Sequence, residues 1–244
     1  MTQGKCKLCG SQGTLRDSHI LPEFVYRPSY DSNHTAVLLD IERQKRGKTQ
    51  KGFTERLLCA GCESLFSGWE TYFAKVWFHS TKRLRPASLS ADLVTIRGLD
   101  YVRFKLFHLS LIWRAGVSTR NEFKNVKLGA QEAKLRIRLL AQEPGGPDDY
   151  PFFGLALRDP TTGGFQDKIL KAPDATRING HRVYTLVFGG VLWHYWVSGH
   201  TVGRIVPAKF SPSGELILAV QNWTENVFVR DMASKLGPKM RKPP

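Results

Sequence analysis

The sequence predicts an α+β protein in which a zinc-bound N-terminal subdomain precedes a portion built from helices and an antiparallel sheet. Three observations support this fold class. All four cysteines fall into two pairs of the same spacing, apolar residues recur at helical spacing in the middle of the chain, and the last third is rich in β-branched and aromatic residues. With 244 residues and 41% hydrophobic content, the chain can bury a core in one large or two modest domains.

The first third of the chain has the pattern strand, strand, helix. Residues 18–21 (SHIL) predict a short strand, and residues 34–41 (HTAVLLDI) predict a second one. The basic stretch at residues 43–51 (RQKRGKTQK) is expected to connect these strands to the next element. After the last cysteine, ESLFSGWETYFAKVWF (residues 63–78) places its leucine and aromatic residues at helical spacing, which predicts an amphipathic helix.

The cysteines form two CxxC steps, Cys6 with Cys9 and Cys59 with Cys62, and none is left over. Two intervening residues let both thiols of a pair reach one ion from a tight turn, and two such turns complete the tetrahedral set of thiolates that structural zinc prefers. We therefore expect one shared structural Zn²⁺. The alternative is that the cysteines are unrelated buried or redox residues.

A domain boundary is expected near residue 84. Residues 83–92 (RLRPASLSAD) contain a proline and several small polar residues, which is typical of a linker. This division gives a zinc-bound domain at residues 1–84 and an α+β domain of unknown role at residues 85–244.

The second domain is predicted to begin with helices, within about residues 93–142, and to continue with strands, within about residues 151–230. DYVRFKLFHLSLIWRAG reads as an apolar helix with Asp100 as its N-cap, and LGAQEAKLRIRLLAQE reads as an amphipathic helix that PGGPDDYP ends. The strand segments are FFGLALR, RVYTLVFGGVLWHYWV and GELILAVQ. We expect them to form an antiparallel sheet that packs against the helices.

Two groups of residues in this second domain have both a structural and a functional interpretation. Trp193, Tyr195 and Trp196 could stack on nucleic-acid bases, but aromatic residues in so apolar a run favour a buried strand. His108 lies on an almost entirely apolar helix, so we expect a core or interface side chain.

The strong positive charge indicates a polyanionic partner. A formal net charge of +15 and a pI near 9.9 suit a protein whose lysines and arginines neutralise phosphates, so nucleic acid is the expected partner; the alternative is a basic surface that binds none. The N-terminus lacks the pattern of a signal peptide. The longest apolar run, residues 184–197, is too short and too interrupted to span a membrane. We therefore expect a cytoplasmic protein that does not bind membranes.

The motifs CKLC, SHILP and LLCAGCE, in this order, resemble the zinc-clamped members of the HNH, or ββα-metal, nuclease superfamily. The resemblance covers the N-terminal third of the chain. It implies a ββα-metal fold and a metal-dependent endonuclease that hydrolyses phosphodiester bonds, most simply in DNA, with RNA as the alternative substrate. It also implies one catalytic divalent ion, Mg²⁺ or Mn²⁺, and a role such as restriction or phage defence.

The same resemblance assigns roles to individual residues. His19 matches the general base of the family, which deprotonates the attacking water. Glu63 stands where a histidine ligand of the catalytic ion is usual, and Glu70 follows on the same side of the helix, within roughly 20° of it. Ser18 replaces an acidic or imidazole ligand, so Asp17 or Glu70 would have to compensate.

Each of these candidates also has a structural interpretation. His19 could stabilise the turn before Pro22. Glu63 could be present because the helix dipole favours an acidic residue in the first turn, and Glu70 could be a solvated helix residue. Asn33 is a loose match to the asparagine that orients the base in the family, but both Asn33 and its neighbour His34 suit a turn.

Two functions follow from these alternatives. The first is an HNH-like endonuclease whose C-terminal portion contacts substrate, a partner protein or a second copy of the chain. The second is a non-catalytic zinc module that binds nucleic acid or protein and retains a degraded HNH site.

Overall fold

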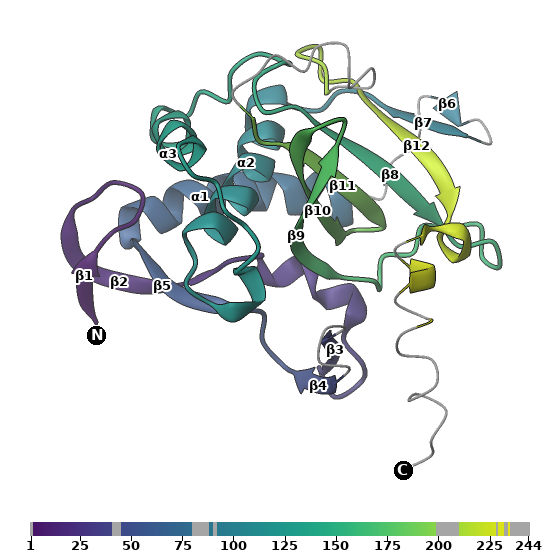
Figure 1. The fold of residues 1–244 in the computed structure, drawn as a ribbon, viewed down its shortest axis with the longest axis horizontal. Helices are drawn as coiled ribbons and strands as arrows, with labels where there is room; N and C mark the ends of the chain where they lie inside the picture. Colours follow the sequence, from purple (N-terminus) through teal and green to yellow (C-terminus); the bar gives the residue numbers. More distant parts are fainter. Residues whose placement is uncertain are drawn as a thin grey trace.

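The computed structural model describes residues 2–40, 45–79, 88–89, 92–198, 210–227, 229–231 and 234. Within them the protein is α+β: a small three-stranded sheet and helices α1, α2 and α3 lie beside a curled, mixed seven-stranded sheet (Figure 1). The strands are β1 (Gln3–Lys5), β2 (Gln12–His19), β3 (Ala36–Asp40), β4 (Lys45–Thr49), β5 (Thr54–Cys59), β6 (Ser88–Leu89), β7 (Leu93–Ile96), β8 (Phe152–Arg158), β9 (Lys171–Ile178), β10 (His181–Phe188), β11 (Val191–Trp196) and β12 (Leu216–Asn222). The helices are α1 (Ala60–Ala74), a π-helical extension (Lys75–His79), α2 (Tyr101–Val117), α3 (Gln131–Ala141) and the 3₁₀ turns Glu23–Val25, Arg27–Ser29, Asn121–Phe123 and Trp223–Glu225.

In the N-terminal region, β2 pairs antiparallel with both β1 and β5, and α1 begins directly after β5. The predicted helix is confirmed as α1 and its extension. The predicted strand at residues 18–21 is only the end of β2, because Ile20 and Leu21 lie beyond it. The predicted strand at residues 34–41 is β3, but it pairs with β4, which forms within the basic stretch that we expected to be a connection.

Helix α2 is the centre of the core. Asp100 caps it as predicted, accepting a hydrogen bond from the Arg103 backbone N–H at 3.0 Å. Every residue from 104 to 115 is buried, so this helix is covered on all sides. His108 is fully buried and its Nδ1 lies 2.8 Å from the Tyr195 hydroxyl, which confirms the core interpretation.

The seven-stranded sheet has the order β6-β7-β12-β8-β11-β10-β9. Neighbouring strands are antiparallel except β12 and β8, which are parallel, so the expectation of a purely antiparallel sheet is wrong. The residues expected to begin the helical stretch at position 93 instead form β7. The run at residues 182–197 is two strands, because Gly189 and Gly190 have positive φ angles of 60° and 77° and form the hairpin turn between β10 and β11.

Trp193, Tyr195 and Trp196 of β11 are each at most 2% exposed. They are therefore buried strand residues, and the base-stacking interpretation is wrong.

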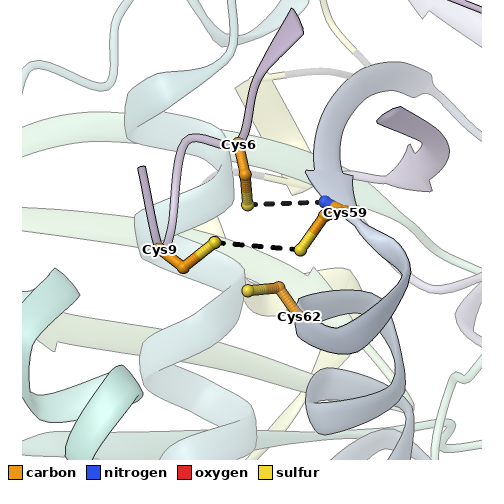
Figure 2. Close-up of side chains that lie close together, drawn as sticks. All are labelled: Cys6, Cys9, Cys59 and Cys62. Atoms are coloured by element: carbon orange, nitrogen blue, oxygen red, sulfur yellow. Dashed lines mark hydrogen bonds between the residues drawn. The ribbon is translucent and has the colours of Figure 1, made fainter. Parts of the chain in front are cut away.

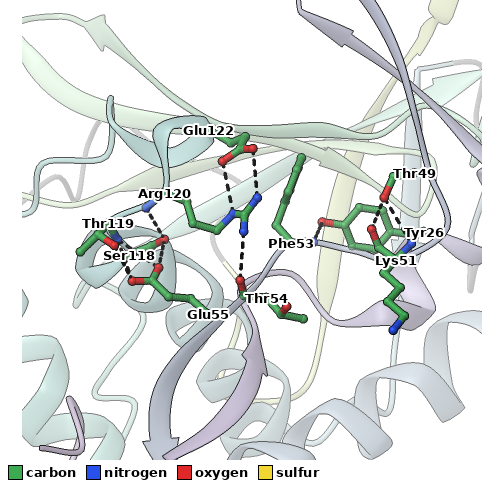
Figure 3. Close-up of polar contacts among 10 residues, drawn as sticks. All are labelled: Tyr26, Thr49, Lys51, Phe53, Thr54, Glu55, Ser118, Thr119, Arg120 and Glu122. Carbon is green, nitrogen blue, oxygen red and sulfur yellow. Dashed lines mark hydrogen bonds and ion pairs between the residues drawn. The ribbon is translucent and has the colours of Figure 1, made fainter. Parts of the chain in front are cut away.

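Polar contacts join the end of α2 to β5 (Figure 3). The Glu55 carboxylate accepts hydrogen bonds from the Ser118 hydroxyl at 2.5 Å and from the Thr119 hydroxyl at 2.7 Å. Arg120 Nη1 donates to the Thr54 carbonyl at 3.2 Å. One hydrophobic core contains residues from both sides of position 84. The division into domains at residues 1–84 and 85–244 stays a prediction, and most of the predicted linker at residues 83–92 lies outside the described residues.

No helix in the described part of the chain combines the length and the apolar character needed to cross a membrane. The basic C-terminal tail, residues 235–244, lies outside the described residues, as do Arg43 and Gln44 of the first basic stretch.

Candidate functional site

The four cysteines come together from two places in the chain. Cys6 and Cys9 lie in the tight turn between β1 and β2, which closes with a hydrogen bond of 2.9 Å from the Gly10 N–H to the Cys6 carbonyl. Cys59 ends β5 and Cys62 lies in the first turn of α1. Their sulfur atoms all lie within 4.8 Å of one another (Figure 2). This proximity agrees with the spacing-based prediction.

The geometry of the four-cysteine cluster suits a tetrahedral zinc ion. Four sulfurs at the usual Zn–S distance of about 2.3 Å lie about 3.8 Å apart in a tetrahedron, and the Sγ atoms of Cys9 and Cys59 are 3.8 Å apart. None of the four cysteines forms a disulfide. The donor set therefore fits a structural Zn²⁺.

The cluster is also electrostatically suited to a cation. Hydrogen bonding by Ser11 lowers the pKa of the Cys9 thiol to about 6, which favours the thiolate form that zinc binds. Burial raises the pKa of the Cys62 thiol. A bound divalent cation would offset the burial of the negative charge and favour the thiolate at both positions.

The cysteine cluster holds the end of β2 beside the start of α1. Leu15 of β2 pairs with Cys59, and a bulge after Arg16 shifts the register of the remaining pairs. Ser18, fully buried on β2, then donates a hydrogen bond of 2.6 Å from Oγ to Oε2 of Glu63. His19, the next residue, is half-buried. Ser18 thus contacts Glu63 instead of standing free as a metal ligand.

Arg114 of α2 supplies the positive charge in this region. Its side chain is 1% exposed, and its Nη1 lies 2.7 Å from Oε1 of Glu70. The same Nη1 donates to the His19 carbonyl at 2.7 Å. The guanidinium also lies over the Phe66 ring, 5.3 Å from its centroid. A buried arginine therefore joins the candidate base on β2 to a candidate ligand on α1.

The electrostatic environment affects the candidate base and the candidate ligand differently. Burial lowers the pKa of His19, and nearby Arg114 adds to the shift, while acidic neighbours oppose it. The imidazole is therefore neutral at physiological pH, as a general base must be. Burial raises the pKa of Glu63, and the hydrogen bond from Ser18 opposes the increase.

The described residues do not gather a compact set of ligands for a second ion. Among them, the four cysteines are the one group of three or more histidine, cysteine or acidic side chains whose ligand atoms converge in this way. Glu63 and Glu70 contact Ser18 and Arg114 instead. The donor set thus does not fit a catalytic Mg²⁺ or Mn²⁺ as it stands, and that cofactor stays a prediction.

The remaining candidates lie in turns or in surface ion pairs. Asp17 lies 3.3 Å from Arg56, and both side chains are exposed. The Asn33 backbone N–H donates to the Asp31 carboxylate within a turn. His34 Nε2 lies 3.8 Å from Glu23. The contacts of Asn33 and His34 match the turn interpretation, whereas Asp17 lies within β2 and is not a turn residue. None of these contacts shows a role at the candidate site.

Sequence reasoning did not identify Arg114. The signal that could have found it is a charged residue in the middle of the apolar run FHLSLIWRAG, since a buried arginine needs a partner. The sequence does not indicate which acidic residue that partner is.

A scan against protein-family models finds no match for this chain, and searches of curated proteins and of solved structures find none either. The HNH resemblance therefore depends on the motifs CKLC, SHILP and LLCAGCE alone, and membership of that superfamily stays a prediction.

Proposed function

We propose that the protein is an HNH-like endonuclease in which His19 deprotonates the water that attacks a phosphodiester bond of DNA. The observation that carries this proposal is that half-buried His19 directly follows Ser18, whose hydroxyl contacts Glu63 at the start of α1, next to the four-cysteine cluster. The net charge of +15 supports a nucleic-acid substrate.

The residues of the chain have separate tasks in this proposal. The zinc-bound cysteines fix β2 against α1, and the Arg114 hydrogen bond to the His19 carbonyl fixes the backbone of the base. A divalent ion, when bound, would stabilise negative charge on the phosphate. Glu63 would be its candidate ligand, because the hydrogen bond from Ser18 occupies only Oε2 and leaves Oε1 to hold an ion. Restriction or phage defence is the biological role that we propose for such an activity.

The test is cleavage of plasmid and single-stranded DNA by zinc-loaded protein with Mg²⁺, with Mn²⁺ and without added divalent ions. General-base catalysis contributes about 10²–10⁴-fold, so His19→Ala should lose at least about 100-fold. The control is His34→Ala, which changes an exposed turn histidine and should cleave like the wild type. Wild-type rates in His19→Ala would remove His19 from the mechanism.

A non-catalytic zinc module that binds nucleic acid is the second candidate. The observation that favours it is that both carboxylates already have partners within the chain. Glu63 accepts a hydrogen bond from Ser18, and Glu70 forms an ion pair with buried Arg114. DNA binding by the zinc-loaded protein, with no cleavage under any of the metal conditions, would support this function over the first.

A further inference from the structure

A groove of about 400 Å³ opens along α1 next to the candidate site. It is lined by Phe24, Arg27, Ser67, Glu70, Thr71, Ala74, Lys75 and His79. At about 100° per residue, Ser67, Glu70 and Ala74 point within about 40° of Glu63 on the helix, and Glu70 lies about 10 Å further along the axis. The groove thus continues the face of α1 on which Glu63 lies.

The groove is electropositive although a carboxylate lines it. Arg27, Lys75 and His79 are exposed, and none of them forms an ion pair within the described part of the chain. The charge of Glu70 is balanced by Arg114, at 2.7 Å on the buried side. Two uncompensated cations and an imidazole therefore face the solvent in the groove.

Phe24 gives the groove a fixed aromatic surface. Its ring packs on the buried rings of Phe73, Phe78 and Phe107, at centroid distances of 6.2, 5.6 and 6.0 Å. The side chain is nevertheless only partly buried and lines the groove. An aromatic ring beside basic side chains is the combination that single-stranded nucleic acid needs, because bases stack on the ring while phosphates contact the cations.

We propose that this groove binds one unpaired strand of nucleic acid, with a base on Phe24 and phosphates on Arg27 and Lys75. This inference rests on the proposed function for the chemical class of the ligand. The volume is near the lower end of the roughly 300–1,000 Å³ of small-molecule sites, so the groove accepts a nucleotide-sized segment. A base can stack on Phe24 only when it is not already stacked and paired within a duplex, so the groove favours an unpaired strand. The strand would lead along α1 from the groove towards Glu63 and His19.

The test is fluorescence anisotropy of a labelled single-stranded DNA oligonucleotide and of the same sequence as a duplex, with zinc-loaded full-length protein and no added divalent ion. The groove variant is Arg27→Gln with Lys75→Gln. The control is Lys134→Gln with Lys168→Gln, which removes the same two charges from exposed positions outside the groove. Circular dichroism and zinc content would verify that each variant is folded.

We expect the groove variant to lose at least tenfold in affinity for the single strand. The slope of log K against log salt should become shallower by about 0.7 for each lost phosphate contact, while the control keeps the wild-type slope. Phe24→Leu should lower affinity by about 5- to 150-fold with no change in slope, because stacking releases no counterions.

The inference would be overturned if the groove variant and the control variant bound the single strand with equal affinity. It would also be overturned if the wild type bound the duplex as tightly as the single strand. The cleavage assay with His19→Ala is separate from this measurement. Groove-dependent binding without any cleavage would leave the inference standing and remove the nuclease proposal. Cleavage that depends on His19 but not on the groove charges would support the nuclease proposal and remove the inference about the groove.

Discussion

The buried pair of Arg114 and Glu70 predicts that Arg114→Met will be strongly destabilising. The Arg114 side chain is 1% exposed and the Glu70 side chain 21%, so the substitution leaves a mostly buried negative charge without its partner. It also removes the hydrogen bond to the His19 carbonyl. Both losses affect the same region between β2, α1 and α2.

The magnitude follows from these two contributions. Removing one partner of a buried ion pair costs about 3–5 kcal/mol, and the partial exposure of Glu70 favours the lower end of that range. The lost hydrogen bond adds about 1 kcal/mol. We therefore expect Arg114→Met to lower the free energy of unfolding by about 3–4 kcal/mol. Changing Glu70 to Met as well should recover at least about 1 kcal/mol, because no charge is then left unpaired.

Urea unfolding of the zinc-loaded protein, followed by tryptophan fluorescence, measures these differences. The control is Arg103→Met on the same helix, whose ion pair with Asp100 is exposed on both sides and should contribute less than about 1 kcal/mol. The reasoning is wrong if Arg114→Met costs no more than Arg103→Met. It is equally wrong if the effects of the Arg114 and Glu70 substitutions simply add.

Three further predictions concern other parts of the molecule. Elemental analysis should find about one zinc per chain, and Cys62→Ser should lower both zinc content and thermal midpoint. Burial lowers the pKa of Lys105 from 10.5 to about 7. Between pH 7 and pH 10.5 the unfolded chain therefore binds more protons than the folded chain, and the free energy of unfolding rises with pH. Lys105→Met should therefore be more stable than the wild type near pH 7 in urea unfolding, and the advantage should shrink by up to about 1.4 kcal/mol per pH unit towards pH 10. Gly189→Ala should cost about 1–3 kcal/mol in the same assay, because a Cβ at this position, where φ is +60°, would lie 2.5 Å from Trp77 Nε1.

Each of these outcomes can fail separately. Zinc-free protein that unfolds at the same temperature as zinc-loaded protein would contradict the structural role of the metal. A stability difference between Lys105→Met and the wild type that is the same at pH 7 and pH 10 would contradict the depressed pKa. Wild-type stability of Gly189→Ala would mean that Trp77 can move without losing its 3.0 Å hydrogen bond to the Gly189 carbonyl.

Local signals predicted the helices and the cysteine cluster well. Phe66, Trp69 and Phe73 recur at helical spacing and form the buried face of α1. The Asp100 cap marks the start of α2, since capping depends on residues only three positions apart. The two CxxC steps predicted that four sulfurs would converge, because each pair already presents two ligands from one turn.

Pairing between distant segments could not be predicted in the same way. The parallel contact between β12 and β8 pairs residues 218–222 with residues 154–158, and nothing in either segment specifies its neighbour. The basic stretch became β4 because β3 offered it a partner, which overrode its polar composition. Strand pairing thus depends on tertiary context, whereas a helix can be predicted from the local spacing of its apolar residues.

The same distinction explains the candidate site. The sequence predicted that Glu63 and Glu70 share one face of a helix. Both lie on α1, but their partners come from different elements: Ser18 from β2 and Arg114 from α2. Because Arg114 lies in the second predicted domain and His19 in the first, the candidate base depends on both for its position. If the isolated residues 1–84 folded, Glu70 would lose its buried cation and the apolar face of α1 would lose its cover. The proposed chemistry therefore has to be tested in a chain that contains both the N-terminal region and α2.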